Sequence, residues 1–158
     1  MRRTKSDPDL ESLVRRIRDG EIDLQPDFQR DEIWDTPRRQ RLIDTVLRNW
    51  YVPAIHIVVD SEGEDVVLDG QQRLAAIRDF FASKIKVNGS TEPPDERIQR
   101  LDGLTYEKLP DEVRRAVNSF SISVIKLDAY EPQEPHELFF RLTQSYNLTP
   151  PENPNALH

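Results

Sequence analysis

The sequence contains no cysteine, which excludes disulfide bonds and thiolate metal sites. No hydrophobic run approaches membrane-spanning length, and the first residues lead into no signal-peptide core. The three histidines, one of them the last residue, support neither a histidine-metal nuclease site nor a Ser-His-Asp triad. A Walker-type phosphate loop is also absent. These absences favour a cytoplasmic protein whose chemistry depends on none of these sites.

The chain is long enough, at 158 residues, for one domain with a buried core. Its net charge of −7 argues against a general affinity for DNA. The charge is uneven, because residues 1–50 hold 11 basic and 11 acidic groups, and ten of the basic groups are arginine. A phosphate-binding surface is therefore expected to be a local pocket that draws on these arginines and on Arg73.

Hydrophobic periodicity predicts helices over residues 9–19, 36–50, 71–81, 110–117 and from 135. It predicts strands over 22–24, 54–59, 64–68 and 120–127, with a hairpin turn at 60–63. Thr36 is the expected N-cap of the second helix, and Trp50 is expected to point inward at its end. Residues 84–104 read as a loop, and 146–158 as an irregular tail. The pattern predicts an α+β fold, with a small mixed sheet flanked by helices.

The turn from Asp69 to Arg73 is the predicted centre of function. Gly70 ends an apolar strand, and a helix with one apolar face begins at Gln71. Free N–H groups and the positive end of the helix dipole bind anions, phosphate above all, at such a place. Gln71 and Gln72 could position a water molecule or read a base edge.

A second polar cluster precedes this turn in the chain. Residues 27–30 and Trp34 form it, and both clusters end in Gln-Arg, as Gln29-Arg30 and Gln72-Arg73. An arginine at such a turn offers a planar fork suited to phosphate. The alternative is an internal ion pair, Arg30 with Asp69 or Arg73 with Asp27, that holds two loops together.

Several further side chains have more than one reading. Asp69 could bind a divalent metal, orient a water molecule or cap the following helix. Arg38 opposes the helix dipole in the first turn of its helix, so either an anionic ligand or a neighbouring carboxylate (Asp31, Glu32 or Asp35) is expected to offset its charge. His56 is expected to be structural, and His136 has no obvious partner.

Three motifs in order carry a family resemblance. They are Pro26-Asp-Phe-Gln-Arg30 with Trp34, the helix Arg41-Leu-Ile-Asp-Thr-Val, and Asp69-Gly-Gln-Gln-Arg73 followed by Leu. Tyr106-Glu-Lys-Leu-Pro110, and Phe139-Phe-Arg-Leu142 followed by Leu148-Thr-Pro-Pro-Glu152, also fit. Together they resemble the N-terminal domain of GmrSD-type modification-dependent restriction and phage-defence proteins, a ParB/sulfiredoxin-like fold.

The resemblance implies a nucleotide-binding domain that hydrolyses nucleoside triphosphates with Mg²⁺ and is coupled to DNA recognition or restriction. It implies that the turn from Asp69 to Arg73 is the active-site motif. From the motif set and the distribution of arginines we expect catalytic roles for Asp69, Gln72 and Arg73, with Asp69 also binding the metal. The phosphate-binding residues would be Gln29, Arg30, Arg38, Gly70, Gln71 and Arg73. The alternatives are a non-catalytic nucleotide- or DNA-sensing module that acts with a separate nuclease, and a DNA endonuclease.

The sequence departs from the family pattern at two places. Thr143 stands where family members often have asparagine, so a polar role there is not carried over. The C-terminal HNH nuclease domain that often follows in the family is not in this sequence. A free-standing domain or a part of a longer protein is therefore expected, acting with a nuclease domain or protein.

Overall fold

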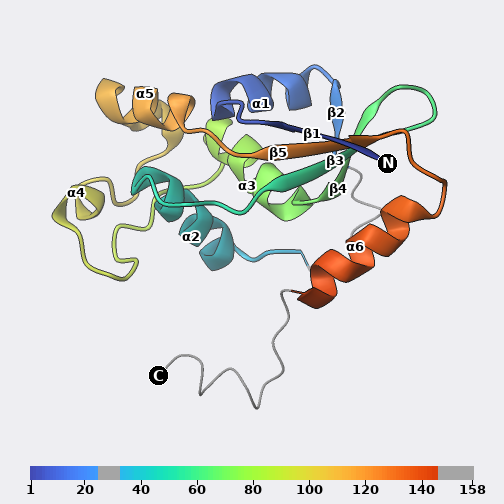
Figure 1. Cartoon of the computed structure of the whole chain (residues 1–158). Helices are drawn as coiled ribbons and strands as arrows, with labels where there is room; N and C mark the ends of the chain where they lie inside the picture. Colours follow the sequence, from blue (N-terminus) through green and yellow to red (C-terminus); the bar gives the residue numbers. More distant parts are fainter. Residues whose placement is uncertain (25–32, 146–158) are drawn as a thin grey trace, which may run out of the picture.

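The computed structural model describes residues 1–24 and 33–145, which form an α+β domain as predicted (Figure 1). The described residues contain a five-stranded mixed sheet in the order β1-β5-β3-β4-β2. The strands are β1 (Arg2–Ser6), β2 (Ile22–Asp23), β3 (Ile55–Val59), β4 (Asp65–Asp69) and β5 (Val124–Asp128). The helices are α1 (Leu10–Arg18), α2 (Thr36–Leu47), α3 (Gln71–Phe81), α4 (Glu96–Gln99), α5 (Asp111–Ser119) and α6 (Glu134–Ser145), with a short 3₁₀ turn η2 (Tyr106–Lys108).

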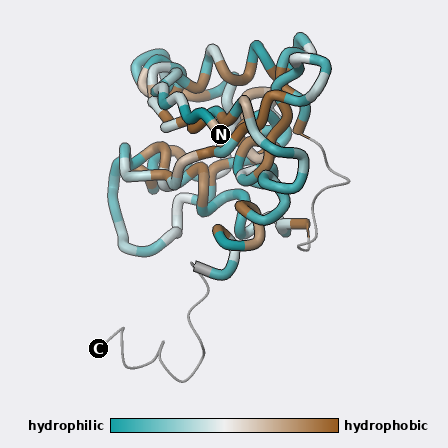
Figure 2. Tube along the Cα trace, turned by 45° about the vertical axis from the view of Figure 1, so that its right-hand side comes forward, coloured by the Kyte–Doolittle hydropathy of each residue, from teal (hydrophilic) through white to brown (hydrophobic). Residues whose placement is uncertain are grey.

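The sheet is covered unequally on its two faces. Because side chains alternate along a strand, Ile57 and Val58 point to opposite faces. Ile57 joins a large core with the helices α1, α2, α3 and α5, whereas Val58 joins a small cluster against α6. Figure 2 shows the hydrophobic segments in the interior and the hydrophilic ones on the outer turns. In Figure 1, α6 lies apart from the other helices at the lower right.

Strands β3 and β4 form the predicted hairpin, with antiparallel register from Val59↔Asp65 toward His56↔Asp69. The turn is closed by Asp60, whose carboxylate accepts hydrogen bonds from the backbone of Glu62 (2.9 Å) and Glu64 (2.8 Å). On its other side β3 pairs in parallel with β5. β4 therefore lies inside the sheet, between β3 and β2, and the turn that follows it starts from this interior strand.

The second helix differs from its prediction at both ends. Asp35, not Thr36, is its N-cap, and the Asp35 carboxylate accepts a hydrogen bond from Arg38 N at 3.0 Å. A carboxylate satisfies a free N–H group and also complements the positive end of the dipole, which a hydroxyl does not. The helix ends at Leu47, and Asn49 takes a positive φ of 59°. Trp50 consequently turns outward and is 50% exposed, so its predicted inward position was wrong.

Three other predictions need correction. Strand β1 was not predicted, because all five of its residues are exposed and it has no apolar face. Residues 120–123 precede β5 rather than belonging to it. The predicted loop 84–104 contains the short helix α4 and buries four side chains, namely Ile85, Val87, Ile98 and Leu101. The predicted tail 146–158 lies outside the described residues.

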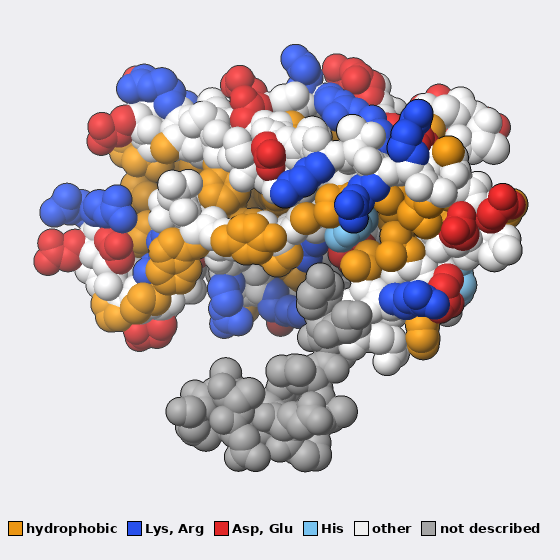
Figure 3. Space-filling model, viewed as in Figure 1, with side chains coloured by type: hydrophobic (Ala, Val, Ile, Leu, Met, Phe, Trp, Pro, Cys, Tyr) orange, Lys and Arg blue, Asp and Glu red, His pale blue; other side chains and the backbone are white. Residues whose placement is uncertain are grey.

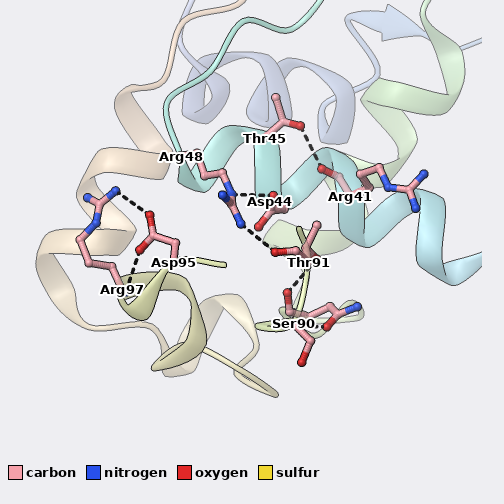
Figure 4. Close-up of polar contacts among 9 residues, drawn as sticks. Arg41, Asp44, Thr45, Arg48, Ser90, Thr91, Asp95 and Arg97 are labelled. Atoms are coloured by element: carbon pink, nitrogen blue, oxygen red, sulfur yellow. Dashed lines mark hydrogen bonds and ion pairs between the residues drawn. The ribbon is translucent and has the colours of Figure 1, made fainter. Parts of the chain in front are cut away.

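A buried ion pair ties this loop to α2 (Figure 4). Arg48 Nε lies 2.8 Å from Asp44 Oδ2, and both side chains are only 4% exposed. Arg48 also donates from Nη2 to the carbonyl oxygen of Thr91 at 2.9 Å, and its guanidinium stacks over the ring of Trp50. Burial raises the pKa of Asp44, while the contact with Arg48 acts to lower it. The loop is thus anchored by charge as well as by its apolar residues.

No helix in the described part of the chain is both long enough and apolar enough to cross a membrane.

Candidate functional site

Gly70 makes the turn between β4 and α3 possible. Its φ is 113°, a left-handed conformation that side-chain-bearing residues rarely adopt. A Cβ atom here would lie 2.4 Å from Ile55 Cδ1 and 3.3 Å from Arg73 Nη2. Both the backbone angle and the close approach of β3 therefore require glycine at this position.

The first turn of α3 has no side-chain cap among the described residues. The N-cap position belongs to Gly70, so the expected alternative that Asp69 caps the helix was wrong. Helix N-termini without a cap keep free N–H donors and a positive dipole end. The predicted strand-to-helix turn with an open helix N-terminus is therefore present.

Asp69 lies between two basic side chains. Its Oδ2 atom is 3.7 Å from Arg73 Nη2 and 3.7 Å from His56 Nδ1. Burial acts to raise the pKa of Asp69, but the contacts with His56 and Arg73 outweigh it and the pKa is lowered. Asp69 is therefore a carboxylate at neutral pH, with the Arg73 guanidinium on one side and the His56 ring on the other.

Arg73 is largely buried and bonds within the protein. Its Nη2 donates to the carbonyl oxygen of Ala54 at 2.9 Å, and its Nε is buried without a hydrogen-bond partner. Burial lowers the pKa of Arg73, and the negative charge of Asp69 opposes that effect. Arg73 thus forms an internal bridge with Asp69, while Asp27, its predicted partner, lies outside the described residues. Both described contacts use Nη2.

His56 belongs to this site, although sequence reasoning treated it as structural. It pairs across the hairpin with Asp69, next to a bulge between His56 and Ile57. Bulges re-aim side chains and are frequent beside active sites. Its side chain is 14% exposed, and Nδ1 is buried without a hydrogen-bond partner. Counting back from the predicted hairpin turn would have placed His56 near Asp69, but the bulge that aligns them has no sequence signal.

The two glutamines of the turn point elsewhere. Gln71 is buried, and its Nε2 donates to the carbonyl oxygens of Val67 (3.1 Å) and Leu68 (3.3 Å). Gln72 accepts a hydrogen bond at Oε1 from Trp34 N at 3.0 Å, and the Arg38 guanidinium lies 5.2 Å from the centre of the Trp34 ring. Gln72 and Arg38 therefore meet through Trp34, between α2 and α3. Gln29 and Arg30 lie outside the described residues.

The cleft beside Gln72 is acidic. Asp60, Glu64, Asp65 and Asp79 line it, together with Arg39 and Arg78. Both of these arginines pair with Asp79, at 3.8 Å and 3.0 Å. Asp65 also pairs with Arg16 and Lys126, but Asp60 and Glu64 have no ion pair within the described part of the chain. Because unpaired carboxylates repel phosphate, the Asp69–Arg73 side of the turn is the better place for an anion.

The strand, the glycine turn and the open helix N-terminus, with an arginine and a carboxylate beside them, define an α+β domain with a turn of the kind that suits an anion. The sequence profile of the family described as GmrSD restriction endonuclease, N-terminal domain, matches residues 10–158. The chain belongs to this family, which confirms the resemblance and places the protein in the context of restriction and phage defence. Comparison with curated proteins returned no match, nor did comparison with solved structures. The finer ParB/sulfiredoxin-like assignment stays a prediction.

Proposed function

We propose that this protein is a cytoplasmic nucleotide-binding domain that hydrolyses nucleoside triphosphates. This activity is coupled to the recognition or restriction of DNA. One observation carries the proposal. The Gly70 turn brings the open N-terminus of α3, an ionised Asp69 and the Arg73 guanidinium to one point. Phosphoryl transfer depends on positioning and charge stabilisation rather than on a covalent intermediate, and these groups supply both.

Each residue has a proposed role. The N–H groups of α3 and Arg73 bind the phosphates, with Nη1 of Arg73 directed to the ligand while Nη2 keeps Ala54 in place. The ionised Asp69 orients the attacking water, and Gln72 is proposed to join it when a bound nucleotide releases its Oε1 from Trp34 N. Gln29, Arg30 and Arg38 are proposed to bind phosphate from the other side, and Gly70 and Gln71 to shape the turn.

Magnesium is proposed to enter with the nucleotide. Mg²⁺ keeps several waters and is usually bound by one or two carboxylates plus phosphate oxygens, so a single carboxylate, that of Asp69, fits this mode. Within residues 1–24 and 33–145 no group of three or more His, Asp or Glu is arranged to hold a metal ion. The ion would neutralise part of the phosphate charge. The chain's own contribution is orientation and the cationic groups.

A non-catalytic sensing module that acts with a separate nuclease domain or protein is the second candidate. The contact of Arg73 with Ala54 favours it, because a ligand that moved this guanidinium would act directly on the segment leading into β3. This candidate predicts nucleotide-dependent thermal stabilisation without turnover. DNA cleavage by the domain itself is the third candidate, and a plasmid-nicking assay with Mg²⁺ or Mn²⁺ tests it.

Phosphate release from each nucleoside triphosphate with Mg²⁺ tests the leading proposal. Wild type should release phosphate, and Asp69→Asn should lower the rate at least tenfold because it removes the charge and keeps the shape. Arg73→Ala should lower nucleotide affinity as well as rate. The matched control is Arg78→Ala, an arginine on the same helix that faces the acidic cleft.

The outcome decides between the candidates. Equal background release by wild type, Asp69→Asn and Arg73→Ala contradicts hydrolysis. Stabilisation of wild type by nucleotide in the same samples would then select the sensing module. Loss of rate in Arg78→Ala equal to that in Asp69→Asn would contradict the assignment of the site.

A further inference from the structure

Strand β1 carries two cations without a partner. Arg2 pairs with Asp128 through two hydrogen bonds, whereas the described residues offer the side chains of Arg3 and Lys5 no hydrogen bond or ion pair. All residues of the strand are exposed. Figure 3 shows Lys and Arg side chains along the middle of this face, where Figure 1 places β1 and β5.

The strand register links these cations to the candidate site. Lys5 pairs with Ile125, Ile125 with His56, and His56 with Asp69, so the four form one row across the sheet. With strands about 4.8 Å apart, Lys5 lies about 14 Å from Asp69. Arg3, two residues along the strand, faces the same side about 6.8 Å away from Lys5. The cations and the turn at Asp69 therefore share one face of the sheet, which is the face on which Leu138 and Phe139 of α6 pack.

The strand also precedes the family match, which begins at residue 10. Its charges are thus additional to the family's own motif. A simpler reading is that Arg3 and Lys5 only guard an edge strand, because charges on an edge deter pairing with another chain. That role would need no particular face. Lys5 lies in the row that ends at Asp69, and Arg3 faces the same side in the row of Leu127. That the two cations share a face with the turn favours a ligand.

We propose that Arg3 and Lys5 bind the phosphate backbone of DNA, and that the bound strand runs from β1 across the sheet toward the Asp69–Arg73 turn. The inference rests on the DNA part of the proposed function and assigns a surface to it. Phosphate contacts of this kind position a nucleic acid without reading its sequence. Binding by this surface does not depend on the DNA sequence, and any recognition of bases is made by another part of the protein.

Binding of labelled single-stranded and duplex oligonucleotides, followed by fluorescence anisotropy over a salt series, tests the proposal. The variant is Arg3→Gln/Lys5→Gln. The control is Lys84→Gln/Lys86→Gln, which removes two exposed cations with the same spacing. We expect about tenfold weaker binding of at least one DNA form, and a salt slope lower by about 1.5, since each phosphate contact contributes about 0.7–0.9. The control should match wild type.

Three results would overturn the surface: no binding of either form by wild type, unchanged affinity and slope in Arg3→Gln/Lys5→Gln, or an equal loss in the control. Polyglutamate binding that falls as much as DNA binding would also overturn it, because the strand would then be a general anion surface. Nucleotide hydrolysis is measured in the same samples. If nucleotide hydrolysis is normal but the DNA-binding results contradict the surface, this inference fails while the proposed nucleotide site stands.

Discussion

At the scale of single residues, the space around Gly70 has the clearest consequence. A Cβ atom there meets Ile55 Cδ1 at 2.4 Å, and the backbone has a φ of 113°. We expect Gly70→Ala to destabilise the protein by about 2–4 kcal/mol, because strain of about 1–3 kcal/mol adds to the clash. Urea unfolding followed by circular dichroism measures the loss.

Two companion variants separate strain from clash. Gly63→Ala has a similar positive φ of 81° but open space around it, so it should cost only about 1–2 kcal/mol. Ile55→Val removes the Cδ1 atom and should make Gly70→Ala less costly than in the wild-type background. Equal costs for Gly63→Ala and Gly70→Ala would contradict the close contact.

The charge of Asp69 predicts a pH dependence. Its pKa is lowered in the folded protein, so its contribution to stability is present above its unfolded pKa of about 3.9 and is lost as the pH falls through the folded value. Asp69→Asn should therefore be less stable than wild type at pH 7, and the difference should shrink in acid. Urea midpoints at pH 7, 5 and 3 measure it. A difference independent of pH would contradict the ion pair of Asp69 with Arg73.

The site was predictable where local pattern determines it. Gly70, the open helix N-terminus and the position of Asp69 follow from a strand that changes to a helix at one glycine. The split between Gln71, which turns inward, and Gln72, which reaches Trp34, was not predictable. It depends on where α2 packs against α3. His56 was missed for a similar reason, since its partner lies across a bulged hairpin.

At the scale of secondary-structure elements, the feature of α2 with the clearest consequence is the buried ion pair between Asp44 and Arg48. Removing one member of a buried pair leaves the other charge unpaired in the interior, which typically costs about 3–5 kcal/mol. We therefore expect Asp44→Ala to destabilise by about that amount, while Asp44→Leu/Arg48→Met should cost clearly less. Chemical unfolding of the three proteins makes the comparison. If the double variant were the less stable one, the pair would be stabilising in itself.

Helix and strand boundaries show the same division between local and distant causes. The N-cap Asp9 of α1 and the hydrophobic face of α3 depend only on residues close in the sequence. Both helices were therefore predicted closely. Strand β1 has no apolar alternation and exists because β5 offers it an edge. The loop 84–104 lacks periodicity, yet it packs because α2 provides Arg48 to it.

At the scale of the whole molecule, the two faces of the sheet differ in depth. Six residues of α3 are buried, whereas none of Glu134–Gln144 in α6 is, although Leu138 and Phe139 pack partly on the small cluster. Local opening follows buried contact, so amides of α6 should exchange with deuterium sooner than those of α3. Hydrogen exchange with mass spectrometry measures both.

A variant sharpens this prediction. Leu138→Ala should speed exchange in α6 and leave α3 nearly unchanged, because the two helices lie on different faces. Equal protection of α3 and α6 in wild type would show that the sheet and both layers unfold as one unit.

The pairing of β1 with β5 also has a consequence for synthesis. Arg2 and Asp128 are separated by 126 positions, and β5 is the last strand of the described sheet to leave the ribosome. During translation β1 therefore stays unpaired until β5 has been made, and exposed strand edges are prone to aggregate in that interval. Its arginines and lysine oppose such association. The charges to which we assign DNA binding in the folded protein thus first protect the nascent chain from aggregation.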